Sequence, residues 1–305
     1  VGFNAFGSMV QNNVNGVQIS GLANLAGGSM HGVQIGGISN VNGNNLAGLS
    51  VSGLVNITGN KAKGVLITGL SNIAGDNMRG LMMSGIMNIT GDKAAGVQLA
   101  GLANVTGEEY DGLMMSGLLN VVGEEMNGMQ LGLFNFASKA KGLQIGLFNY
   151  HKEDMKGLQL GLVNANPQTK VQLMVFGGNS TKINVGARFK NKLFYTILGG
   201  GTHYLDFDDK FSAALFYRAG LELPLYRNLF VSGDLGYQHI ETFRNKKVEG
   251  IPARLYALQA RLNLEYRFTD KFGLFVTGGY GGSRYYNKAR TYDKGVIAEA
   301  GVVLF

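Results

Sequence analysis

The segment Gly32-Val33-Gln34-Ile35-Gly36-Gly37-Ile38-Ser39-Asn40-Val41 is one copy of a unit that recurs through the first half of the chain. Its leading glycine returns every sixteen residues at Gly16, Gly32, Gly48, Gly64, Gly80, Gly96, Gly112 and Gly128. Three further ladders keep the same register and begin at Gly21, Asn24 and Gly27. A fixed period of this kind is typical of repeat proteins, in which each unit packs on its neighbours.

Within each unit, apolar positions 2 and 4 flank a polar position 3, which is the alternation of a β-strand. Positions 7 and 10 are also apolar but lie three residues apart, so the backbone has to bend twice per unit, and the glycines mark the bends. The pattern predicts a β-solenoid of sixteen-residue coils over residues 1–167, with positions 2 and 4 facing inward and position 3 outward. The alternative, in which each unit is one strand of a large antiparallel barrel, would make the same Asn and Gly serve opposite membrane faces.

The asparagine ladder falls at position 9 of every unit, as in Asn24, Asn40 and Asn56. Stacked inward amides can hydrogen-bond to one another and to turn carbonyls, which removes the cost of burying them. Ligand binding by these amides is the alternative. Calcium-binding solenoids carry an aspartate at a fixed place in each repeat, and no such ladder exists here, so we expect no metal and no cofactor.

Two positions predicted to face outward change character toward the middle and later coils. Position 3 is mostly Gln and position 8 begins as Ala or Ser, yet both become apolar further along. The residues concerned are Leu66, Met82, Met87, Met114, Leu119, Phe134 and Phe148. Contiguous exposed apolar surface marks interaction sites, and methionine adapts to varied partners, so we predict a partner-docking flank. The alternative is that these side chains pack beneath the corners or on the second domain. Corner positions 13–16 carry most of the charge, and we expect a solvated edge there.

The repeat ends at Asn166-Pro167-Gln168, and eight alternating segments follow. They span residues 171–178, 182–189, 193–204, 212–225, 228–240, 254–268, 272–286 and 295–305. Their lengths suit tilted transmembrane strands. We therefore predict an eight-stranded antiparallel transmembrane β-barrel over residues 168–305, which makes the whole chain all-β.

Alternation within these segments separates an apolar face from a polar one. In the sixth segment, Leu258, Leu262 and Leu264 share one face, whereas Arg261 and Glu265 share the other. The apolar face would meet lipid and the polar face the lumen. The predicted lumen network is Arg188, Arg218, Glu222, Asp234, Arg261 and Glu265, with Glu299 as a further candidate. Eight strands leave room for little else, so this barrel should be an anchor and not a pore.

The connections between the strands predict which way the barrel faces. Those at 190–192, 224–228 and 269–271 are short, whereas those at 205–211, 241–253 and 287–294 are longer. Short turns are periplasmic in outer-membrane barrels, which would put both barrel ends, and hence the solenoid, in the periplasm. The terminal Phe305 resembles the assembly signal of such barrels. It shares strand parity with Glu299, so either a bulge separates them or one of them faces unexpectedly.

Composition argues against several classes of function. Residues 1–167 carry 8 basic and 9 acidic side chains, net −1, and the rest carry 19 and 11, net +8, spread along strands and turns without forming a patch. That distribution disfavours nucleic-acid binding. There is no cysteine, and the four histidines, His31, His151, His203 and His239, lie at no metal-ligand spacing. We expect no enzyme. No apolar run approaches the roughly 20 residues of a spanning helix.

The units Gly128-Met129-Gln130-Leu131-Gly132-Leu133-Phe134-Asn135 and Gly142-Leu143-Gln144-Ile145-Gly146-Leu147-Phe148-Asn149 resemble the surface-repeat proteins of Bacteroidota and some spirochaetes. The layout of repeat domain plus small barrel is similar to the plug subunit of the type 9 secretion system translocon. The resemblance implies an outer-membrane protein of a Gram-negative bacterium whose periplasmic solenoid docks on a large partner barrel and blocks it. A periplasmic scaffold that binds peptidoglycan or a soluble protein remains the alternative, with enzyme and diffusion pore as lesser ones.

Overall fold

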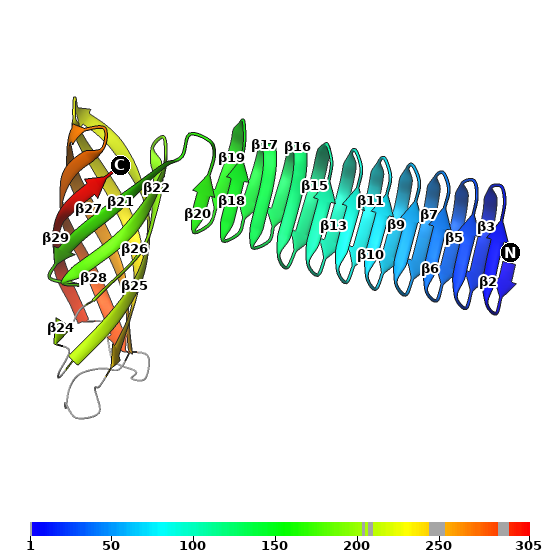
Figure 1. The fold of residues 1–305 in the computed structure, drawn as a ribbon, viewed down its shortest axis with the longest axis horizontal. Coiled ribbons are helices and arrows are strands. Elements are labelled where there is room, and N and C mark those ends of the chain that lie inside the picture. Colours follow the sequence, from blue (N-terminus) through cyan, green and yellow to red (C-terminus); the bar gives the residue numbers. More distant parts are fainter. Residues whose placement is uncertain (1, 203–204, 207–209, 244–253, 286–292) are drawn as a thin grey trace. The chain divides into compact units, whose positions relative to one another are not determined.

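The computed structural model describes residues 2–202, 205–206, 210–243, 254–285 and 293–305 (Figure 1). Every regular element in these ranges is a β-strand. The chain divides into two compact units, Val1–Pro167 and Gln168–Phe305. The first is a β-solenoid and the second a closed antiparallel barrel, which confirms the predicted fold class.

Each regular coil of the solenoid holds one long strand and one short strand. The long strands are β1 (Gly2–Asn4), β3 (Val14–Ser20), β5 (Met30–Gly36), β7 (Leu46–Ser52), β9 (Ala62–Thr68), β11 (Met78–Ser84), β13 (Ala94–Ala100), β15 (Glu109–Ser116) and β19 (Met155–Leu160). The short strands are β2 (Gly7–Val10), β4 (Ala23–Ala26), β6 (Ser39–Asn42), β8 (Val55–Thr58), β10 (Ser71–Ala74), β12 (Met87–Thr90), β14 (Ala103–Thr106), β18 (Phe148–His151) and β20 (Val163–Ala165). In β16 (Leu119–Leu131) and β17 (Phe134–Ile145) the two parts run into one strand.

Successive coils pair in parallel, each residue opposite its equivalent one unit away. Gly32 lies opposite Gly48 and Asn40 opposite Asn56. Figure 1 shows the coils stacked in sequence order along this unit. At ~4.8 Å per coil the stack is on the order of 50 Å long. The parallel pairing excludes the alternative of one long antiparallel barrel for these residues.

The leading glycines are required by backbone geometry. Gly80 has a φ of 130°, and a Cβ added there would lie 2.1 Å from the carbonyl oxygen of Gly64 in the coil before it. Both the left-handed conformation and the close approach exclude an ordinary side chain. The sixteen-residue ladder therefore reflects how tightly the backbones stack.

The asparagine ladder is buried between the two strands of each coil, as predicted. The Nδ2 of Asn72 donates to the Oδ1 of Asn88 at 2.9 Å and to the carbonyl oxygen of Met83 at 2.8 Å. Equivalent amide-to-amide bonds run without a break from Asn24 to Asn164. From Asn24 to Asn149 the Nδ2 of each amide donates both to the next amide and to a backbone carbonyl, so the ladder is structural.

The face of the long strand that points inward is the opposite of the one we predicted. Position 3 faces inward: Gln34, Met82 and Met114 are each 0% exposed. Positions 2 and 4 face outward: Val33 is partly buried and Ile35 is 37% exposed. The predicted alternation is present with the opposite face inside, because Gln34 can be buried by donating from Nε2 to the Oε1 of Gln18 at 3.0 Å.

The barrel has eight long strands in a closed antiparallel ring. They are β21 (Lys170–Gly178), β22 (Ile183–Asn191), β23 (Phe194–Thr202), β25 (Lys210–Tyr226), β26 (Leu229–Phe243), β27 (Arg254–Thr269), β28 (Phe272–Tyr285) and β29 (Asp293–Leu304), with a two-residue β24 (Leu205–Asp206) beside β25. Pairing of β21 with β29 closes the ring. Each predicted segment corresponds to one long strand. The predicted long connections at 205–211, 241–253 and 287–294 lie largely outside the described residues.

The conflict between Phe305 and Glu299 is resolved at the strand end. Glu299 faces inward and is 4% exposed, and Val303 on the same face is 2% exposed. Strand β29 stops at Leu304, and Phe305 has a φ of 78°, in the left-handed region. This turn releases Phe305 from the strand alternation, so that its ring is 68% exposed. Strand parity does not extend to a residue outside the strand.

Candidate functional surfaces

The barrel interior is bridged by buried ion pairs between strands on opposite sides of the ring. Arg188 on β22 donates to Glu265 on β27, with Nη1 2.6 Å from Oε2. Arg218 on β25 donates two hydrogen bonds to the carboxylate of Glu299 on β29, from Nη1 to Oε2 at 2.9 Å and from Nη2 to Oε1 at 3.0 Å. Three strands lie between the partners of each pair on either side of the ring. The side chains therefore fill the lumen, as the anchor hypothesis requires.

Glu299 is the centre of this network. Arg261 also donates to it, from Nε at 3.2 Å and Nη2 at 3.3 Å. Arg261 lies 3.9 Å from Asp234, which accepts a hydrogen bond from the hydroxyl of Tyr195 at 2.9 Å. Charges this deeply buried persist only when they are paired and hydrogen-bonded.

All six predicted lumen residues therefore lie inside the barrel and are 5% exposed or less. The network has further members that were not predicted, among them Lys190, Arg267 and Tyr195. Lys190 and Arg267 both pair with Glu222, and Tyr195 hydrogen-bonds within the lumen. Lys190 has the same strand parity as Arg188, and Arg267 the same parity as Glu265, so alternation places both on the lumen face. Lys190 was instead assigned to the predicted turn at 190–192. Tyr195 faces inward because its hydroxyl can hydrogen-bond to Asp234.

The outer face of the barrel is apolar. Leu215, Leu235, Leu262 and Val296, from four strands, are 64–71% exposed. On each of these strands the neighbouring residues face the lumen. A ring with paired charges inside and aliphatic side chains outside has the polarity of a barrel surrounded by lipid.

The predicted docking flank of the solenoid has to be corrected. Leu66, Met82 and Met114 occupy position 3 and are 0% exposed, so they belong to the interior and cannot contact a partner. The sulfurs of the two methionines accept hydrogen bonds within the core, from Gln98 Nε2 to Met82 Sδ and from Gln130 Nε2 to Met114 Sδ, each at 3.7 Å. The position 8 residues do face outward: Phe134 is 39% exposed, while Met87, Leu119 and Phe148 are partly buried.

An aromatic patch lies over the last coils of the solenoid. It comprises Phe134, Phe136, Phe148 and Tyr150, on β17 and β18. The ring centroids of Phe136 and Phe148 are 5.7 Å apart, and those of Phe136 and Tyr150 are 6.1 Å apart. The predicted docking flank included only the two members at position 8, Phe134 and Phe148.

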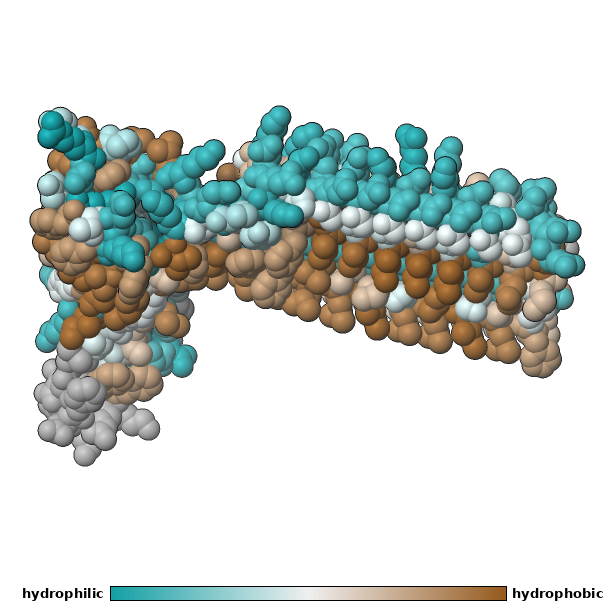
Figure 2. Space-filling view, turned by 45° about the horizontal axis from the view of Figure 1, so that its top comes forward, coloured by the Kyte–Doolittle hydropathy of each residue, from teal (hydrophilic) through white to brown (hydrophobic). Residues whose placement is uncertain are grey.

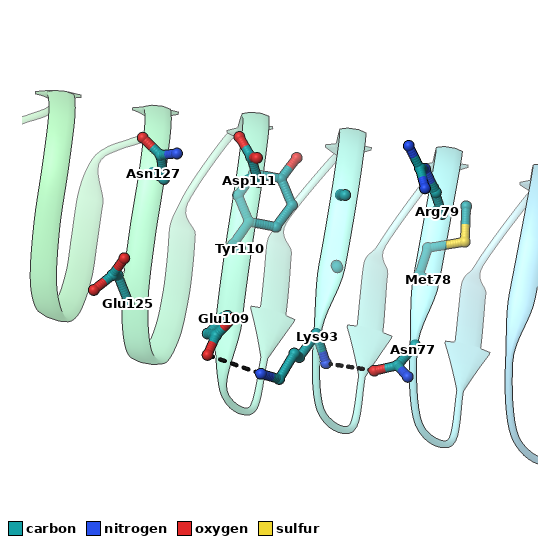
Figure 3. A pocket seen from close by; sticks show the side chains of 11 residues that line it. Asn77, Met78, Arg79, Lys93, Glu109, Tyr110, Asp111, Glu125 and Asn127 are labelled. Atoms are coloured by element: carbon teal, nitrogen blue, oxygen red, sulfur yellow. Dashed lines mark hydrogen bonds and ion pairs between the residues drawn. The ribbon is translucent and has the colours of Figure 1, made fainter.

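The opposite edge of the solenoid is charged. Lys93 pairs with Glu109 at 2.8 Å beside a hollow of about 340 Å³ left by the small side chains Ala94 and Ala95 (Figure 3). Hydrogen bonding to Glu109 raises the pKa of Lys93, and hydrogen bonding from Lys141 lowers the pKa of Glu125. Both pairs are open to solvent, so they contribute little to stability. The edge is solvated, and nothing in the hollow points to a ligand.

The described residues hold no cluster of three or more His, Asp or Glu side chains that could bind a metal ion. Among the same residues, no helix is long and apolar enough to cross a membrane.

Comparisons with known proteins yield little. No family model matches the chain, and no curated protein matches it. Among solved structures, the barrel part is similar to the N-terminal β-barrel domain of Pseudomonas aeruginosa OprF, with 18% sequence identity and a TM-score of 0.31. The match covers 45% of this chain and 98% of that domain. At this score the likeness carries no functional argument, so the proposals below rest on the geometry of the chain itself.

Proposed function

We propose that this chain is a non-enzymatic outer-membrane protein whose barrel anchors a periplasmic solenoid, and that the solenoid docks on a partner channel. The observation that carries the anchor is the polarity of the ring, with Arg218, Arg261 and Glu299 paired inside and Leu215, Leu235 and Leu262 exposed outside. A water-soluble barrel would have the opposite arrangement.

Connection lengths support a periplasmic solenoid. The turns after β22, β25 and β27 span two residues each, at 192–193, 227–228 and 270–271. The first and last barrel strands begin and end on the same side of the ring as these turns. Short turns face the periplasm in outer-membrane barrels, and the solenoid precedes β21 directly in the chain.

The aromatic patch supports docking on another protein. Aromatic residues are enriched at protein interfaces, and a clustered set buries much area at little entropic cost. The resemblance of the two-part layout, a repeat domain followed by a small barrel, to a secretion-channel plug suggests the partner, a large outer-membrane barrel that the solenoid would block. Binding of peptidoglycan is less well supported, because the amides that could contact a sugar, such as Asn88 and Asn104, are 0% exposed.

The first experiment is a pull-down of the tagged protein from its own membranes in mild detergent, followed by mass spectrometry. We expect a large outer-membrane barrel to co-purify. Replacing Phe134 or Phe148 by Glu should abolish this, whereas Lys63→Glu, on the charged edge, should not. Recovery of peptidoglycan fragments, or of the partner with both Phe variants, would contradict the docking proposal and leave the anchor intact.

The anchor is tested separately by replacing Leu262 with Lys. A lysine on the lipid face near the middle of a strand costs about 2–4 kcal/mol, so the heat-stable folded band on an unboiled gel should weaken. Lys271→Leu, in a short turn outside the lipid-facing band, is the control. Equal stability of the Leu262→Lys barrel in detergent and in vesicles would reject the lipid-facing assignment.

A further inference from the structure

We propose that the solenoid inserts an apolar ridge into one leaflet of a lipid bilayer and lies along the membrane surface. The ridge is the set of outward side chains at repeat positions 2, 4, 7 and 10, apart from those of the aromatic patch, and position 7 forms its crest. The crest residues are Leu22, Ile38, Leu54, Leu70, Ile86, Leu102, Leu118, Leu133 and Leu147. The inference deepens the proposed function, because it rests on the barrel being in a membrane.

The ridge is continuous along the solenoid. Its crest residues are 37–50% exposed, and Figure 2 shows the hydrophobic side chains as a brown band along one edge of this unit. Beside the crest, Ile35, Met83 and Met115 at position 4 are 37–41% exposed. Exposed apolar surface of this extent indicates a surface that is covered in the functional state.

Charge is excluded from the ridge. All 8 Lys and Arg and all 9 Asp and Glu side chains of residues 1–167 occupy repeat positions 12–16, on the opposite edge. Figure 2 shows this edge as a teal band. Positions 2 and 4 are ~7 Å apart along a strand, so the ridge is on the order of 10 Å deep. That depth matches the insertion of interfacial amphipathic elements, whose charged face stays in water.

The backbone of the ridge meets the requirement of an apolar solvent. At the crest, the N–H of Ile38 donates to the carbonyl oxygen of Leu22 at 2.7 Å, and that of Leu54 donates to Ile38 at 2.8 Å. The flanking strands are paired in parallel ladders on both sides. A turn in contact with acyl chains is stable only if its polar groups are bonded within the protein.

Composition favours lipid over a protein along most of the ridge. Protein interfaces use aromatic residues and arginine as anchors, whereas the crest holds only Leu and Ile from Leu22 to Leu147. The exterior of the barrel of this chain is likewise aliphatic, with buried polar groups behind it. In the solenoid, the buried column of Asn88 and Asn104 lies behind the exposed Ile86 and Leu102. A row of only Leu and Ile side chains along the crest suits lipid acyl chains, which are fluid and require no specific contacts.

The chain also keeps the ridge near a membrane. Strand β20 ends at Ala165 and barrel strand β21 begins at Lys170, so residues 166–169 alone connect the units. A barrel in the bilayer therefore holds the ridge at a high effective concentration next to the lipid surface.

The test relies on the absence of tryptophan from the chain, so that each variant carries one tryptophan at a chosen site. Leu70→Trp and Leu102→Trp place a single fluorophore on the crest, Lys61→Trp places one on the charged edge, and Leu262→Trp places one on the barrel exterior. Each full-length variant is reconstituted in phosphatidylcholine vesicles with ordinary or brominated acyl chains. Circular dichroism and the folded band on an unboiled gel verify that each variant is folded.

We expect brominated lipid to quench the Leu70→Trp, Leu102→Trp and Leu262→Trp variants severalfold and to leave Lys61→Trp unchanged. Quenching of the barrel probe alone would overturn the leaflet proposal and leave the anchor standing. A crest probe with blue-shifted but unquenched emission would show that protein, such as a second copy, covers the ridge, which also overturns it. Failure of the Leu262→Trp probe would instead reject the anchor.

Discussion

At the scale of single residues, the solenoid combines a buried hydrophobic cluster, which includes Met30, Leu46 and Met126, with a column of buried amides. The asparagine column supplies two hydrogen bonds per coil, one to the next amide and one to the next backbone. The leading glycines allow neighbouring backbones to approach within the reach of a Cβ. Each repeat ladder thus corresponds to one physical constraint of stacking.

Replacing Asn88 by Ala should open the coils around it. The substitution removes bonds to Asn104 and to the carbonyl of Leu99 and leaves the amide of Asn72 without its acceptor. Each buried group left unsatisfied costs roughly 1–3 kcal/mol. Hydrogen exchange should accelerate in β10–β14, whereas Asn127→Ala, at an exposed site, should leave it unchanged. Unaltered protection would show that water replaces the amide.

Gly80→Ala should be more damaging than Gly16→Ala. Both glycines have a positive φ, of 130° and 126°, but an added Cβ meets the Gly64 carbonyl at 2.1 Å in the first case and nothing within 4 Å in the second. Strain alone costs about 1–3 kcal/mol, and the steric overlap adds to it. Hydrogen exchange of the solenoid amides in the two variants measures how far each substitution destabilises the coils around it. Equal destabilisation would mean that the positive φ, and not the close approach of the Gly64 carbonyl, is why glycine is required.

Because the phenol of Tyr110 is buried, we predict that the folded protein becomes less stable at high pH. Burial raises the pKa of its phenol far above the usual value, and its hydroxyl lies 2.6 Å from the carbonyl oxygen of Leu113. The unfolded chain loses this proton near pH 10 while the folded chain keeps it, so stability falls as the pH rises beyond that point. Denaturant unfolding at pH 9 and pH 11 should show a smaller fall in Tyr110→Phe. An identical fall in both proteins would assign it to other groups.

At the scale of elements, strands from opposite sides of the ring are joined through Glu299. This carboxylate faces Arg218 and Arg261 and is fully buried. Its neutralisation would leave two guanidinium groups short of negative charge in a site closed to water. The closed ring therefore depends on one residue of the last strand as well as on backbone pairing.

Glu299→Gln should lower the stability of the barrel by about 3–5 kcal/mol, the usual cost of removing one partner of a buried pair. The temperature at which the folded band disappears on a gel measures the loss. Glu241→Gln is the matched control, because its partner Arg254 is 61% exposed and the pair is open to solvent. Equal temperatures for the two variants would mean that water reaches the lumen and screens the pair.

At the scale of the whole molecule, both units present apolar side chains on the surfaces proposed to meet a membrane and bury polar groups behind them, next to hydrophobic clusters. The barrel hides its charges in the lumen, and the solenoid hides its amides behind the ridge. A chain of this kind needs an assembly route that protects its apolar exterior. Phe305, exposed and outside the last strand, is placed where an assembly factor could contact it.

Phe305→Ser should reduce the amount of folded protein in the outer membrane of cells without altering the stability of protein refolded in detergent. The ring is 68% exposed and contributes little to packing, while the backbone N–H keeps its bond to the Lys271 carbonyl at 2.8 Å. Membrane fractionation measures the first effect and gel heat-modification the second. A loss of stability in vitro would assign Phe305 a structural role.

The sequence by itself determined the solenoid period, the boundary near residue 167, the eight barrel strands and the six lumen charges. These follow from spacing, which depends only on local backbone geometry. The tertiary structure alone decided the phase of the solenoid strand, and with it the burial of Leu66, Met82 and Met114 and the exposure of the ridge. Alternation fixes which residues share a face. Which face is inside depends on whether stacked neighbours can satisfy Gln and Asn side chains, and that is a property of the assembled coils.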